Sequence, residues 1–115
     1  MLMGMDAERA ENEVFRALAD PTRRALLSML GEEAQPVSAL TGRFEMSQPA
    51  ISQHLKVLRE AGLVSERKVG RNRIYALDPE PLRHAAEWLE RHTDFWATRL
   101  DNLGRHLREK HGKDA

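Results

Sequence analysis

Hydrophobic side chains recur every three or four residues through several stretches of this chain, a spacing that is typical of amphipathic helices. The expected helices cover residues 6–19, 21–30, 37–41, 47–61 and 81–109. Asp20 and Ser47 are expected N-caps, since each is followed by a proline in the first helical turn. Gly31, Gly42 and Gly62 are the expected stops of the three middle helices.

Between the last two helices the pattern changes to that of a β-hairpin. Residues 63–68 and 73–77 have strand-like composition, and Gly70 and Asn72 suit a tight turn between them. A short helix, a turn, a polar helix and a hairpin, in that order, predict a winged helix-turn-helix, whose second paired helix enters the major groove. We therefore expect a mainly α fold of about five helices with a small two-stranded wing. The single expected domain covers 1–115, with the helix-turn-helix at 37–61 and the wing at 63–77.

The composition limits what this fold can do. A chain of 115 residues has room for one modest core, and the absence of cysteine excludes disulfides and thiolate metal sites. There is no apolar stretch long enough to span a bilayer, and no export signal, so we expect a cytoplasmic protein. The net charge is zero, but residues 43–75 hold seven cations against three anions. A local basic surface, rather than bulk charge, would attract nucleic acid.

The fourth helix separates apolar and polar positions cleanly. Ile51, Leu55 and Leu58 share one stripe, while a second stripe carries short hydrogen-bonding side chains and two cations, which suit base edges and phosphates. His54 lies off the polar stripe, so a structural hydrogen bond is its alternative role. An ordinary amphipathic surface helix is the alternative for the whole segment. The DNA-contacting residues expected from this helix are Ser47, Gln48, Ser52, Gln53, His54, Lys56 and Arg59.

The wing adds further cations. Because side chains alternate between the faces of a strand, Arg67 and Lys68 cannot both point at DNA. Arg71 is the expected wing-tip contact, with Lys68 and Arg73 as further DNA-binding candidates. A solvated edge strand protected by its charges is the alternative.

The last helix carries an apolar seam too long for a core of this size. Its spacing approaches a heptad repeat, so we expect a partner helix from a second copy, with intramolecular packing as the alternative. The seam residues are Leu82, Ala85, Leu89, His92, Trp96, Leu100, Leu103 and Leu107.

Three segments, Phe15–Leu30, Met46–Val64 and Gly70–Tyr75, resemble the ArsR-type winged-helix transcriptional repressors. The resemblance covers about residues 12–105 and implies a homodimeric repressor of double-stranded DNA, usually autoregulatory, acting on a palindromic operator. It also implies that the dimer forms through the first and last helices, which adds Val14 and Leu18 to the interface. Many relatives release DNA when a metal, a small molecule or a protein inducer binds.

The metal sites of such relatives are poorly matched here. Residues 37–40 hold no thiol, which removes the cysteine site. In the last helix, His92 and Asp94 stand in the reverse of the order found in the family's metal site. The spacing from this pair to His106 and Glu109 is one residue longer than in that site, which turns a ligand by about 100° around the helix. We therefore expect no metal and no cofactor, with a metal- or ligand-responsive repressor as the alternative.

Other function classes have less support. The sequence lacks a nucleophile elbow, a phosphate-binding glycine loop and a paired-carboxylate motif, so we expect no enzyme. A winged helix used only for protein–protein contact would have a neutral recognition face, which this chain does not have.

Overall fold

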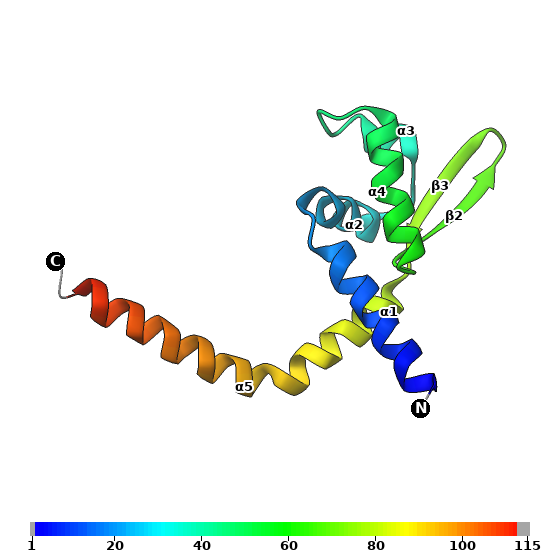
Figure 1. Cartoon of the computed structure of the whole chain (residues 1–115). Helices are drawn as coiled ribbons and strands as arrows, with labels where there is room; N and C mark the ends of the chain where they lie inside the picture. The colour runs from blue at the N-terminus through cyan, green and yellow to red at the C-terminus, as the bar shows by residue number, and fades with distance from the viewer. Residues whose placement is uncertain (1, 113–115) are drawn as a thin grey trace. The chain divides into compact units, whose positions relative to one another are not determined.

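A computed structural model describes residues 2–112, including the side chains of 8–94, 97–99, 101, 102, 104 and 105. The chain forms two units, Met1–Ala85 and Ala86–Ala115. Within the described residues the elements are α1 (Leu2–Leu18), α2 (Pro21–Glu32), β1 (Gln35–Pro36), α3 (Val37–Thr41), α4 (Gln48–Glu60), β2 (Val64–Val69), β3 (Asn72–Leu77) and α5 (Pro79–Gly112) (Figure 1). This is the expected winged helix-turn-helix.

The core of the first unit lies where α4 packs against α2 and α3. Ile51, Leu55 and Leu58, the predicted apolar stripe of α4, are completely buried. They meet Leu26 of α2 and Leu40 of α3, which are equally inaccessible to solvent. Burial of side chains of this size contributes about 1.5–3 kcal/mol each, so α4 is firmly fixed on its inner side. Its outer side is therefore presented by a rigid scaffold.

Local hydrogen bonds fix both ends of α4. The Ser47 hydroxyl accepts a hydrogen bond from the backbone N–H of Ala50 at 3.3 Å, as expected for an N-cap. At the other end Gly62 has φ of 79°. The Gly62 N–H donates to the Arg59 carbonyl and the Leu63 N–H donates to the Leu58 carbonyl, both at 2.9 Å. This is the Schellman arrangement, which confirms Gly62 as the stop.

The wing belongs to a sheet of three strands in the order β1-β3-β2, rather than the two that we expected. β1 pairs antiparallel with β3, with Gln35 opposite Tyr75 and Pro36 opposite Ile74. A strand of two residues is too short to show periodicity, and its proline is tolerated because β1 is an edge strand. Only the hairpin β2–β3 extends beyond the helices in Figure 1.

Several helix boundaries differ from those expected, including the end of α5, which lies at Gly112 rather than at residue 109. α1 begins at Leu2, and α2 continues past Gly31 to Glu32, with the Glu33 N–H donating to the Met29 carbonyl at 3.4 Å. Glycine weakens a helix by about 1 kcal/mol without ending it when the backbone hydrogen bonds continue. α5 begins at Pro79 because Asp78 accepts a hydrogen bond from the Glu80 N–H at 3.1 Å. Asp78-Pro79 thus starts a helix as well as ending a strand.

Candidate nucleic-acid interface

The outer face of α4 has the exposure that reading DNA requires. Gln48, Ser52, Gln53, Lys56 and Arg59 are all exposed, and so is the N-cap Ser47. Uncharged amide and hydroxyl groups in the first turns recognise base edges, whereas cations near the end of the helix suit phosphates. The predicted polar face is therefore free to meet a ligand.

This face forms one wall of a groove of about 500 Å³ between α4 and the wing. Val37 of α3 also lines the groove, and residues of β2 and β3 line it opposite α4. Three cations and a single carboxylate line it, so its charge is positive. The lining residues are Val37, Gln48, Pro49, Ser52, Gln53, Lys56, Arg59, Glu66, Arg73 and Tyr75. The groove thus brings together residues that are separated by up to 38 positions in the chain.

The strand register decides which wing cations face this groove. Lys68 lies opposite Arg73, and Glu66 lies opposite Tyr75. Because alternate residues share a face, these four side chains lie on one side of the hairpin, and Arg67 lies on the other. Lys68 therefore shares the face of the hairpin that carries Glu66, Arg73 and Tyr75, and Arg67 does not.

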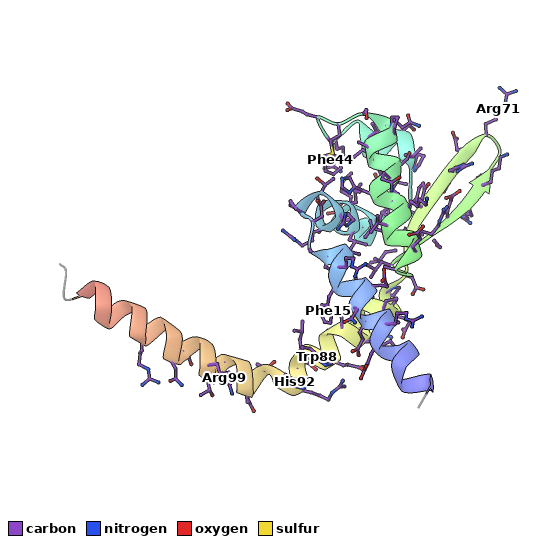
Figure 2. The ribbon with its side chains drawn as sticks, viewed as in Figure 1. Phe15, Phe44, Arg71, Trp88, His92 and Arg99 are labelled. Carbon is purple, nitrogen blue, oxygen red and sulfur yellow. The ribbon has the colours of Figure 1, made fainter. Side chains whose placement is uncertain are left out.

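Arg71 occupies the tip of the wing. It follows Gly70, whose φ of 63° gives the left-handed backbone that a two-residue hairpin turn requires. Arg71 is exposed, and its guanidinium points away from the rest of the unit (Figure 2). A cation on such an extension can reach a phosphate or the minor groove next to a site read by α4.

Glu66, which the sequence analysis did not single out, organises the groove. Its carboxylate forms an ion pair with Arg59 of α4, a second with Arg73 of β3 at 3.4 Å, and accepts a hydrogen bond from the Tyr75 hydroxyl at 3.1 Å. The Glu66 side chain is 18% exposed, against 46% for Arg59 and 64% for Arg73. The carboxylate therefore lies beneath two guanidinium groups that remain open to solvent.

Burial of the Tyr75 ring raises the pKa of its hydroxyl, and the hydrogen bond to Glu66 raises it further. Tyr75 consequently remains a neutral donor across the physiological pH range. A two-residue turn at Gly70-Arg71 fixes the strand register and so places Glu66 opposite Tyr75. The turn residues in the sequence are therefore a signal from which this contact can be predicted. Nothing in the sequence places Arg59 beside Glu66 and Tyr75.

His54 points to the inside of the unit rather than along the polar face. It is half-buried, and its Nδ1 lies 3.4 Å from Arg23 Nη1 and 3.9 Å from Asp20 Oδ2. These are the contacts of a structural side chain, the alternative left open by the sequence. His54 thus links α4 to Asp20 and Arg23.

Asp20 and its neighbours cap two helices at once. Asp20 accepts a hydrogen bond from the Arg23 N–H at 3.0 Å, which is the predicted N-cap of α2. Arg23 donates to the carbonyls of Arg16 and Ala17, and Arg24 to that of Leu18, all in the last turn of α1. The hydrogen bond from the Arg23 N–H holds the pKa of Asp20 below its ordinary value, with the charges of His54 and Arg23 acting in the same direction.

The predicted dimer residues fall into different environments. Val14 is 4% exposed and belongs to the core of its own unit, and Leu18 packs against that core. In the second unit Leu89 is 51% exposed, whereas His92 is half-buried and stacks on Trp88 with 4.3 Å between the ring centroids (Figure 2). Leu89 is thus a large apolar side chain that is about half exposed among the described residues. The side chains of Trp96, Leu100, Leu103 and Leu107 lie outside the described residues.

Two further findings concern metals and membranes. Among the described side chains, no cluster of three or more His, Asp or Glu residues is arranged to hold a metal ion. His92 and Asp94 belong to that set, whereas the side chains of His106 and Glu109 do not. No helix within residues 2–112 has the length and apolar content needed to cross a bilayer.

Comparison with known proteins agrees with this geometry. Residues 20–66 match the family described as "Bacterial regulatory protein, arsR family". The chain is 41% identical over 96 residues to the HTH-type transcriptional regulator Rv2034 of Mycobacterium tuberculosis, covering 84% of this chain and 87% of that protein. It is 33% identical to the transcriptional repressor SdpR of Bacillus subtilis, covering 68% and 87% respectively.

A solved structure extends the likeness to three dimensions. The crystal structure of the ArsR family transcriptional regulator RHA00566 has a TM-score of 0.72 and 36% sequence identity, covering 78% of this chain and 93% of that one. The matched segment 20–66 includes the capping residue Asp20, all of α4 and Glu66. The fold, the exposed polar helix and these likenesses together show that the chain belongs to the ArsR family of DNA-binding bacterial transcriptional regulators.

Proposed function

We propose that this regulator represses transcription as a homodimer bound to a short palindromic operator, acting in the cytoplasm and without catalytic activity. The observation that supports it most directly is the positive groove that uncharged hydrogen-bonding side chains and cations line together. Gln48, Ser52 and Gln53 would read base edges, and Lys56, Lys68 and Arg71 would bind phosphates. In this proposal specificity comes from α4, and the cations supply much of the affinity.

A second copy is part of the proposal because one α4 helix reads only half a site. Leu89 is an exposed apolar residue on the predicted seam of α5, and a large apolar side chain at 51% exposure gains stability when a partner covers it. We propose that α1 and α5 form the dimer. A two-fold axis would then place two recognition helices about 34 Å apart, which matches two half-sites one DNA turn apart.

Footprinting on the DNA upstream of the protein's own gene tests this proposal. The expected result is a protected palindrome, bound by two chains per duplex in fluorescence anisotropy titrations, with a scrambled duplex of equal length as the control. Deletion of the gene should raise transcription from that promoter. Binding that does not discriminate the upstream sequence from the scrambled duplex at low salt, or one chain per duplex, would contradict it.

A further inference from the structure

The arrangement around Glu66 goes beyond the proposed binding of DNA. Two guanidinium groups from different elements, Arg59 of α4 and Arg73 of β3, converge on one carboxylate. The carboxylate accepts a hydrogen bond from the hydroxyl of Tyr75, a residue that is 6% exposed. Glu66 is therefore fixed from three directions, and it ties the recognition helix to the wing.

This geometry has an electrostatic consequence. Both arginines are open to solvent and could meet phosphates, yet together with Glu66 they present a net charge of only +1. Non-specific affinity for DNA comes almost entirely from phosphate neutralisation and counterion release. A half-buried anion beneath the two cations therefore lowers affinity for every DNA sequence, whereas the neutral side chains Gln48 and Gln53 keep their hydrogen-bonding capacity.

The geometry also has a positional consequence. A guanidinium has many rotamers when free, and restricting it before binding lowers the entropy lost in a defined complex. A carboxylate that holds Arg59 and Arg73 at fixed positions should favour a duplex whose phosphates fit them. Random DNA would gain less affinity from the fixed arginines, because it binds in many registers and its phosphates rarely fit them.

We propose that Glu66 is a specificity-determining residue: it fixes Arg59 and Arg73 between the recognition helix and the wing and thereby raises the ratio of operator to random-DNA affinity. Glu66 acts through the arginines rather than by touching DNA, so it is a positioning residue. This inference rests on the proposed function of the same surface. Glu66, the one carboxylate that lines the groove, would then help to discriminate the operator from random DNA as well as stabilise the fold.

The variant Glu66→Gln tests the proposal because it keeps the shape of the side chain and removes its charge. Its affinity for random DNA should rise, and the slope of log affinity against log salt should steepen by about 0.9 per protomer, which is about 3.5-fold in affinity between 50 and 200 mM salt. The ratio of operator to random-DNA affinity should fall about tenfold, the scale of a lost hydrogen bond to a charged group.

Two further variants separate charge from position. Glu60→Gln removes the same charge from an exposed position on α4 that does not line the groove, so it should leave the ratio unchanged. Tyr75→Phe removes the hydroxyl that holds Glu66 but no charge. It should weaken operator binding several-fold and leave the salt slope for random DNA as it is.

The outcomes are distinguishable. If the wild type prefers its operator and Glu66→Gln lowers both affinities equally together with thermal stability, Glu66 is a structural residue and the inference is wrong, although the proposed function stands. An equal gain in affinity for random DNA in Glu60→Gln and Glu66→Gln would also overturn the inference, since the net charge alone would then explain both variants. A wild type without operator preference would overturn the proposed function, and the inference with it.

Discussion

The imidazole of His54 on the recognition helix lies beside the guanidinium of Arg23 on α2, with 3.4 Å between Nδ1 and Nη1. Arg23 in turn caps the last turn of α1, and Asp20 beside it caps α2. This capping cluster, consisting of Asp20, Arg23, Arg24 and His54, therefore links α1, α2 and α4. The orientation of α4 therefore depends on this cluster as well as on the hydrophobic core.

Removing the N-cap should destabilise the fold. We expect Asp20→Ala to lower the free energy of unfolding by about 1 kcal/mol, because it leaves the Arg23 N–H without its acceptor. Asp20→Asn is the matched control, since asparagine is an equally good N-cap without the charge. Urea unfolding followed by circular dichroism measures both. Equal midpoints for the wild type and Asp20→Ala would show that this cap contributes nothing.

The same carboxylate should give stability a pH dependence. The pKa of Asp20 is lowered in the folded protein, chiefly by the hydrogen bond from the Arg23 N–H, which outweighs the opposite effect of burial. The unfolded chain therefore binds more protons near the ordinary pKa of about 3.9, and the stabilisation is present above that pH and lost as the pH falls through the lower folded pKa. The stability advantage of the wild type over Asp20→Ala should shrink as the pH falls below about 4. An advantage that grows on acidification would contradict this.

Tyr75 is the single tyrosine of the chain, so its ionisation can be followed by absorbance without interference from another phenol. Burial and then the hydrogen bond to Glu66 raise its pKa, so the folded protein should titrate above about 10 and the chain in denaturant near 10. The corresponding stabilisation is complete below pH 10 or so and is lost as the pH rises through the folded pKa. Glu66→Gln should lower the folded pKa only in part, because burial is the larger cause. A folded pKa at or below the denatured value would contradict this account.

The sequence predicted most of the architecture because the relevant signals are local. Ser47, Gly62 and the three-to-four spacing of Ile51, Leu55 and Leu58 each depend on neighbouring residues, and each has the predicted role in the structure. β1 was missed because two residues have no periodicity, and the start of α5 because Asp78-Pro79 suits a strand end and a helix start equally.

The candidate site was predicted less completely, for a related reason. The polar face of α4 follows from helical geometry alone, and its residues are exposed as expected. Glu66 and the contacts of His54 depend on how α4, the wing and the turn between α1 and α2 pack together, which a one-dimensional pattern does not encode. Val14 was expected at the dimer interface from the family resemblance, yet it is 4% exposed within its own unit.

The proposed dimer makes its own prediction about Leu89, which is exposed on α5. Leu89→Glu should abolish self-association at micromolar concentration, because it would place a charge in an apolar seam. Thr98→Glu adds the same charge on the opposite side of the helix, about 180° away, and should leave the dimer intact. Sedimentation velocity distinguishes the two, and circular dichroism checks that both remain folded. A Leu89→Glu protein that still sediments as a dimer would place the interface elsewhere.

The most direct test of the central claim, that α4 reads bases while the wing binds phosphates, compares Gln53→Ala with Arg71→Ala. Both residues are exposed, so either substitution should leave the fold intact. Affinities are measured for the operator and for random DNA over a series of salt concentrations. Gln53→Ala should weaken the operator about tenfold and random DNA little, because it removes contacts to one base pair. Arg71→Ala should weaken both about equally and reduce the salt slope by about 0.9 per protomer. If the two variants lose operator and random-DNA affinity in the same proportion, the division of roles between helix and wing is wrong.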